Sequence, residues 1–352
     1  MKILSLVAIT SVLIISCNNS KNADNSRVRQ QVDTVGFASY SWQVDSIMSR
    51  LDKRGWNKTT GDPWKLAICP HDDYTYVGTL YPEVLYNVRS DNIILLGVAH
   101  KAASLGLENY LVFDTHPYWY GPYGNVKVSA ARDEMLDMLG EDYAVISDTM
   151  HIVEHSLESM IPFLQYFNED VSIIPILVPA MSPERMKDCG RRLAGVVSVI
   201  AERNGWEWGT DYSIIVTTDA VHYGNEDWGG KDYAAYGCDD EGNKIAMEYE
   251  LEIINNCLQG MVGPENFRLF SEYTIDDNDF RKYKWTWCGR YCVPVALYTA
   301  FYLNDARLIK GELLGYSSSI TSEHIPVGDL GMGTTAIATD CHWVGYAALG
   351  YR

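Results

Sequence analysis

Short runs of apolar, often β-branched residues alternate along the chain with segments whose apolar residues recur at helical spacing. The runs predict buried strands over 64–69, 92–98, 171–178 and 213–218. The periodic segments predict helices over 79–89, 129–139, 156–167, 183–203, 244–258 and 291–303. Strands that alternate with helices are typical of βαβ units. We therefore expect an α/β fold with a mainly parallel central sheet flanked by helices.

The last part of the sequence has a different pattern. The segments 306–318, 334–343 and 344–351 read as strands joined by short links, which favours an antiparallel extension of the sheet. We find no internal repeat and no clear linker after residue 35. The pattern therefore predicts one α/β domain over 36–352.

The first residues read as a leader. Met1 and Lys2 precede an apolar run over 3–15, followed by Ser16 and Cys17, which is typical of a secretory signal over 1–16. The end of this run resembles the lipobox of bacterial lipoproteins, which implies lipidation of Cys17; the alternative is a plain secretory signal with an incidental cysteine. The polar residues 17–35 predict a flexible tether. We expect a lipid-anchored protein of the bacterial cell envelope, on the periplasmic face or the cell surface.

Charge and cysteine content narrow the functional classes. The 352 residues carry a formal net charge of −18, which argues against a nucleic-acid partner and against polybasic attachment to a membrane surface. The membrane contact that we expect is therefore through the lipid anchor alone. If Cys17 carries lipid, seven of the 8 cysteines remain, so at least one thiol stays unpaired in an oxidising compartment.

Histidines follow three of the predicted strands. His71, His100 and His222 come shortly after the strands at 64–69, 92–98 and 213–218. The carboxyl ends of parallel strands meet at one edge of a sheet, where ligands bind. A single histidine after a strand is usually an ordinary loop residue, but three at one edge indicate a metal or acid–base site.

Two further segments carry candidate residues. His155 and Glu158 are three positions apart and would share a face of a helix. One interpretation is the start of a helix, where acidic residues interact favourably with the helix dipole. The other is that Glu158 orients a catalytic or metal-binding histidine. Cys288 precedes an apolar helical stretch, where the helix dipole would favour its thiolate. A buried structural cysteine and a disulfide are the alternatives for Cys288.

The motifs around these residues resemble the Memo-like family, also called AmmeMemoRadiSam system protein B. They are Pro70-His71-x-x-Tyr74-x-Tyr76-x-Gly78, Leu95-Leu96-Gly97-x-x-His100, Glu154-His155-Ser156-Leu157-Glu158, Thr218-Asp219-x-x-His222-Tyr223-Gly224 and Cys288-Gly289. The resemblance implies a fold similar to the LigB-like class III extradiol dioxygenases. It also implies one copper or iron ion held by His71, His100 and Cys288. Asp219 and His222 would line the same pocket as catalytic residues, with His155 and Glu158 nearby and Asp219 holding His222 as a proton carrier.

The chain departs from the family pattern at two places. Asp72 and Asp73 follow the first histidine where the family usually has Ala-Gly, and Lys101 replaces a second histidine after His100. The predicted leader would remove the chain from the cytosol, so a radical SAM partner is not assumed.

Three functions follow as hypotheses. The first is copper- or iron-dependent redox chemistry, resembling that of a dioxygenase, on an unknown small molecule or peptide. The second is a non-catalytic lipoprotein that binds a peptide or glycan in the same pocket. The third is a zinc hydrolase, since two histidines and a cysteine with an open position also suit zinc.

Overall fold

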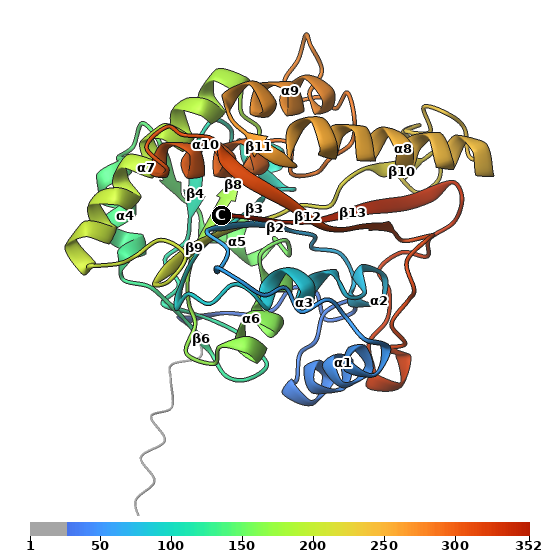
Figure 1. Ribbon diagram of the computed structural model, residues 1–352, viewed down its shortest axis with the longest axis horizontal. Helices are drawn as coiled ribbons and strands as arrows, with labels where there is room; N and C mark the ends of the chain where they lie inside the picture. Colours follow the sequence, from blue (N-terminus) through green and yellow to red (C-terminus); the bar gives the residue numbers. More distant parts are fainter. Residues whose placement is uncertain (1–26) are drawn as a thin grey trace, which may run out of the picture.

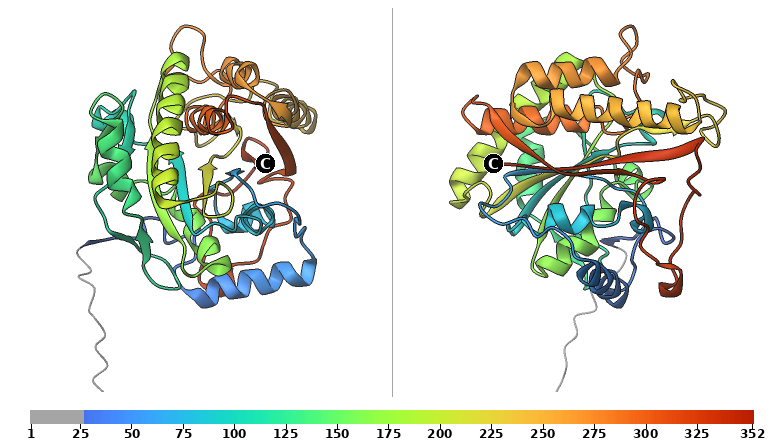
Figure 2. Two further views of the ribbon diagram at one scale, coloured as in Figure 1. Left: turned by 60° about the vertical axis from the view of Figure 1, so that its left-hand side comes forward. Right: turned by 45° about the vertical axis from the view of Figure 1, so that its right-hand side comes forward.

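A mixed β-sheet runs through the middle of the computed structural model, which describes residues 27–352, and helices cover both faces of the sheet (Figures 1 and 2). The strands are β1 (Val28–Arg29), β2 (Leu66–Cys69), β3 (Asn92–Val98), β4 (Leu111–Phe113), β5 (Tyr118–Trp119), β6 (Val126–Val128), β7 (Ala144–Ile146), β8 (Ser172–Val178), β9 (Tyr212–Thr217), β10 (His222–Gly224), β11 (Gly260–Val262), β12 (Ile309–Ser318) and β13 (His342–Tyr351). The α-helices are α1 (Ser41–Arg54), α2 (Tyr74–Val77), α3 (Leu80–Leu85), α4 (Ala131–Leu139), α5 (Asp148–Ile152), α6 (Ile161–Phe167), α7 (Pro183–Asn204), α8 (Asp240–Cys257), α9 (Pro264–Thr274) and α10 (Cys292–Leu303). Short 3₁₀ helices lie at η2 (Ala102–Leu105), η3 (Glu158–Met160) and η4 (Gly328–Leu330).

The centre of the sheet is parallel. The order of the main path is β1-β5-β6-β8-β3-β9-β2-β13-β12-β11, and the pairs from β6 to β2 are all parallel. The four buried strands predicted from the sequence correspond to β2, β3, β8 and β9. The prediction of a mainly parallel sheet flanked by helices is therefore confirmed.

Both faces of the parallel strands are buried, which explains their nearly continuous apolar sequences. In β3, Ile94 and Leu96 join the core on one face, whereas Ile93 and Leu95 join the core on the other. Helices α4, α7, α8, α9 and α10 cover the first face, and α1, α2, α3 and α6 cover the second (Figure 1). The carboxyl ends of the strands are thus held in a fixed register by two cores.

The antiparallel extension is present, but one of its predicted strands is wrong. β13 lies between β2 and β12 and pairs antiparallel with both. The predicted strand over 334–343 is irregular up to His342, because its backbone N–H groups donate to side chains rather than to a neighbouring strand. The N–H of Thr335 donates to Asp73 Oδ2 (2.6 Å), and that of Ala338 donates to the hydroxyl of Tyr76 (3.1 Å).

The predicted tether over 17–35 needs a correction for its second half. Arg29, in β1, is buried and forms an ion pair with the carboxylate of Glu158. The N–H groups of Val32 and Asp33 donate to the same carboxylate at 2.9 and 2.6 Å. This segment therefore lies against the folded body, because one buried carboxylate binds three of its residues.

The predicted signal peptide over 1–16 and the predicted lipid site at Cys17 lie outside the described residues, and both stay predictions. Within 27–352, no helix combines the length and the apolar character needed to cross a membrane.

Candidate metal site

The histidines that follow β2 and β3 lie next to each other at the edge of the sheet. The ring centroids of His71 and His100 are 5.4 Å apart, with the rings perpendicular. His155 joins them: its ring stacks on His100 at 5.0 Å and lies 5.8 Å from His71. The expectation that strand ends bring these side chains together is therefore met for His71 and His100.

Cys288 completes this cluster from a loop that precedes α10. Its Sγ lies 3.5 Å from His71 Nε2 and accepts a hydrogen bond from the N–H of Asp219 at 3.1 Å. A Cβ on the next residue, Gly289, would lie 2.3 Å from Thr218, so only glycine permits this close approach of the loop to the end of β9.

The thiol of Cys288 is not at a helix N-terminus, contrary to the sequence-based expectation. Helix α10 begins four residues later, at Cys292, and Cys288 is buried. Burial and the neighbouring Asp219 raise the pKa of Cys288 well above its ordinary value. In the absence of a bound cation, the structure thus favours the thiol form over the thiolate.

Glu154 orients His100. Its Oε1 lies 2.9 Å from His100 Nδ1, and its Oε2 accepts the backbone N–H of His100 at 2.7 Å. Burial acts to raise the pKa of Glu154, but His100 and His155 and several hydrogen bonds hold it well below its usual range. An ionised carboxylate on Nδ1 places the proton on that nitrogen and leaves Nε2 as the free ligand atom.

The contacts of Glu158 lie away from the histidines, and its catalytic role stays a prediction. Residues 153–157 do not form a helix that would place Glu158 on a face shared with His155, and Glu158 begins η3 instead. Its carboxylate binds Arg29 and the N–H groups of Val32 and Asp33. Burial raises the pKa of Glu158, although Arg29 and these N–H groups lower it. The glutamate that orients a histidine is Glu154, which stood in the family motif without an assigned role.

His71 is buried between β2 and β9. Its Nδ1 lies 3.2 Å from Thr217 Oγ1, and its Nε2 lies 3.4 Å from Asp219 Oδ2. Burial and the neighbouring His100 and His155 lower the pKa of His71 well below its ordinary value. Burial and Asp72 raise the pKa of Asp219 well above its ordinary value. His71 is therefore a neutral imidazole, which is the form that ligates metal.

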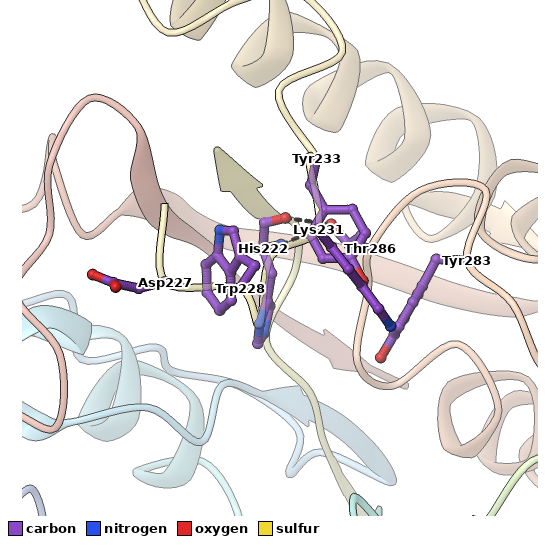
Figure 3. Close-up of a pocket in the computed structure, with 7 residues that line it drawn as sticks. All are labelled: His222, Asp227, Trp228, Lys231, Tyr233, Tyr283 and Thr286. Atoms are coloured by element: carbon purple, nitrogen blue, oxygen red, sulfur yellow. Dashed lines mark hydrogen bonds between the residues drawn. The ribbon is translucent and has the colours of Figure 1, made fainter. Parts of the chain in front are cut away.

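His222 lies near the cluster, but Asp219 does not hold it by a hydrogen bond. The Asp219 carboxylate accepts the N–H of His71 instead (2.9 Å), and within 27–352 the buried His222 Nε2 has no hydrogen-bond partner. Figure 3 shows the His222 ring beside the indole of Trp228, where it lines a cavity of about 230 Å³. Burial, His100 and His342 lower the pKa of His222 to about 3. His222 is therefore a neutral imidazole, and its role as a proton carrier stays a prediction.

Asp72 and Asp73, which distinguish this chain from the family pattern, bind partners outside the cluster. Asp72 Oδ2 accepts the hydroxyl of Tyr346 at 2.6 Å, and Asp73 binds Thr335. Burial, Asp72 and other contacts raise the pKa of Asp73 to about 7. Asp73 thus attaches the segment before β13 to the loop that carries His71, and Asp72 attaches β13 itself to that loop.

Three groupings of side chains have ligand atoms that lie within 4.8 Å of one another. They are His71 with His100 and Cys288, His100 with Glu154 and His155, and Asp219 with His222 and Cys288. The first fits a metal ion: the 3.5 Å between His71 Nε2 and Cys288 Sγ suits two ligands that each lie about 2.0–2.3 Å from one tetrahedral ion. Both Nδ1 atoms have oxygen partners, and Nε2 of His71 lies between Cys288 Sγ and Asp219 Oδ2, at 3.5 and 3.4 Å.

A cavity of about 580 Å³ opens beside this grouping. His100 and Cys288 line it, together with apolar residues of η2 and the aromatic rings of Tyr283 and Tyr291. Its volume lies in the range of sites for small molecules. The grouping is therefore accessible to a small molecule from one side.

Fold and site together define a mixed α/β protein with a candidate His/His/Cys metal centre at the carboxyl ends of its parallel strands. The sequence model of the Memo-like protein family matches residues 38–331, which is most of the chain. The chain therefore belongs to the Memo-like family, as its motifs indicated.

Curated relatives agree with this assignment. The chain is similar to a MEMO1 family protein of Methanothermobacter thermautotrophicus, with 27% identity over 165 residues, 46% of this chain and 56% of the relative. It is also similar to MEMO1 family proteins of Aquifex aeolicus (30% over 161 residues, 45% and 54%) and Saccharolobus islandicus (30% over 163 residues, 44% and 52%). The chain thus spans about half the length of the curated relatives it matches.

Glu154 gives a first test of the site. We expect Glu154→Gln to lower the affinity for a metal ion about 10- to 100-fold, because the amide no longer fixes the His100 tautomer and ring as the carboxylate does. Competition titration of the purified variant against a chelator measures this change. The exposed Glu141→Gln serves as the matched control and should bind as the wild type does. Equal affinities of the two variants would contradict the orienting role.

Proposed function

We propose that the chain is a metal-dependent oxidoreductase in which His71, His100 and Cys288 hold one copper or iron ion and the substrate is a small molecule. The observation that carries the proposal is the grouping of these three ligand atoms within 4.8 Å. Two imidazoles and a thiolate suit copper and iron, because softer sulfur and nitrogen ligands favour transition metals over magnesium or calcium.

The surrounding residues support such a site. Glu154 and Thr217 contact the Nδ1 atoms of His100 and His71, which would leave both Nε2 atoms to act as ligands. The N–H of Asp219 donates to the sulfur of Cys288, which stabilises negative charge there. Bound copper or iron would supply one-electron chemistry and open coordination positions for oxygen or substrate.

The place proposed for this chemistry is the bacterial cell envelope, with Cys17 as the lipid anchor. This part of the proposal is supported by the sequence of residues 1–17 alone. The substrate would reach the site through the cavity of about 580 Å³.

Metal analysis of the purified protein tests the function. We expect up to one equivalent of copper or iron, located by anomalous diffraction among His71, His100 and Cys288, and oxygen uptake when a reductant is supplied. Cys288→Ser should lose the metal, whereas the partly exposed Cys341→Ser is the matched control and should keep it.

Two other results would contradict redox chemistry. Bound zinc without oxygen uptake would favour a hydrolase. Absence of any metal, combined with thermal stabilisation by a peptide or glycan, would favour a binding protein that uses the same cavity.

A further inference from the structure

Three arginines are buried among residues 27–352, and they differ in their partners. Arg29 forms an ion pair with Glu158, and Arg132 lies 3.2 Å from Asp114 and 2.8 Å from Asp133. Arg290 is equally buried, but no carboxylate of the described chain lies within the 4.0 Å of an ion pair. Arg290 is thus the buried arginine without a counter-charge in this part of the chain.

The guanidinium of Arg290 is also incompletely hydrogen-bonded. One amino group, Nη2, donates to the carbonyl of Arg281 at 3.1 Å, and the buried Nε has no partner within 27–352. The rings of Tyr283 and Tyr291 lie over the guanidinium, with centroids at 3.6 and 4.3 Å. Aromatic faces attract a cation but do not bind its N–H groups, which point outward in the guanidinium plane. A buried, uncompensated charge is costly, so its retention needs an explanation.

The position of Arg290 supplies the explanation. It follows Cys288 by two residues, and both residues line the cavity of about 580 Å³ together with His100. The cavity lining holds one more arginine, Arg281. Its charge is compensated, because it binds the carboxylate of Glu108 through two N–O contacts of 2.9 and 2.8 Å. Arg290 is therefore the cation of this cavity that is free to accept a negative group from a ligand.

We propose that Arg290 binds the oxyanion group, a carboxylate or a phosphate, of the small molecule that occupies this cavity. The planar fork of a guanidinium matches both groups in a bidentate arrangement. Tyr283 and Tyr291 add aromatic surface for the rest of the ligand. This inference rests on the proposed function, since it names the substrate class of the same site: an organic anion whose reactive part lies toward His100 and Cys288.

Binding of matched probes tests the inference without any requirement for metal. Benzoate, phenyl phosphate and the neutral benzamide are titrated calorimetrically into the purified protein after dialysis against a chelator. We expect at least one anion to bind and benzamide not to bind; which anion binds distinguishes carboxylate from phosphate. Arg290→Gln should weaken binding about tenfold or more, because a charge-assisted hydrogen bond is lost. Exposed Arg268→Gln, on α9, is the matched control and should bind as the wild type does.

Unchanged anion binding by Arg290→Gln, or no binding of either anion to the wild type, would overturn the inference. The melting temperature gives a second readout: Arg290→Gln should lower it by less than Arg132→Gln does, because it breaks no ion pair. A decrease as large as that of Arg132→Gln would identify Arg290 as a structural residue and overturn the inference as well. Failure of the proposed function can be told apart from failure of this inference. The first would appear as a wild-type protein without copper or iron, whatever the anion titration shows.

Discussion

Replacement of His71 by alanine is expected to abolish retention of copper or iron by the purified protein. His71 is buried, and its Nε2 lies 3.5 Å from the sulfur of Cys288. Its removal deletes one of the three proposed ligands, and no other imidazole of the described residues occupies the same position between β2 and β9. The loss of metal affinity should be larger than the loss of about 10- to 100-fold expected when a residue that only hydrogen-bonds to a ligand is replaced. Elemental analysis after gel filtration measures the bound metal.

A matched histidine provides the control for this variant. His324 is exposed and contacts the carbonyl of Ser319 at 2.8 Å, so His324→Ala should keep the metal content of the wild type. Equal metal content in His71→Ala and the wild type would remove the basis for the metal site described above.

Glu158→Ala is expected to lower the free energy of unfolding by about 3–5 kcal/mol. The substitution leaves the buried guanidinium of Arg29 without its carboxylate and the N–H groups of Val32 and Asp33 without their acceptor. Denaturant unfolding followed by tryptophan fluorescence measures the change. The metal content of the folded variant should equal that of the wild type, because Glu158 does not contact the histidine cluster.

Two comparisons separate this effect from a general cost of losing a glutamate. Glu272→Ala, which breaks the exposed ion pair with Arg268, should cost at most about 1 kcal/mol. The double variant Arg29→Met/Glu158→Leu should recover much of the lost stability, because it leaves no buried charge unpaired. A Glu158→Ala protein that is as stable as the wild type but has lost its metal would instead support the role at the metal site that the sequence predicts for Glu158.

The parallel centre of the sheet was predictable because its strands are long, apolar and buried on both faces. The predicted strand over 92–98 coincides with β3, and the predicted helix over 183–203 corresponds to α7, which begins at Pro183 with Ser182 as its N-cap. Strands such as β4, β5 and β7 have only two or three residues, so no apolar period can develop within them. The segment 334–343 has strand-like composition, but side chains of Asp73 and Tyr76 bind its N–H groups.

The candidate site was predictable where it depends on strand ends and unpredictable where it depends on loops. His71 and His100 follow parallel neighbours in the sheet, so their proximity follows from topology. The sequence analysis placed His155 and Glu158 on one helix face, but residues 153–157 are not helical, and the carboxylate that contacts His100 is that of Glu154. The segment is fixed instead by the close contact between Gly97 and Leu157, where a Cβ on the glycine would lie 2.4 Å from a leucine methyl carbon. Arg290 lies two residues after Cys288 in the sequence, but only the structure shows that its side chain is buried and that no carboxylate of residues 27–352 pairs with it.

The pairing of β13 with β2 has a consequence for how the site forms during folding. Leu349 pairs with Ile68, so the strand that carries His71 gains one of its two neighbours from residues that lie almost the whole described chain away. Closing so long a loop is entropically costly, and contacts of this range form slowly. The candidate ligands His71, His100 and Cys288 should therefore come together late in folding, so a metal ion would meet them still separated on the nascent chain.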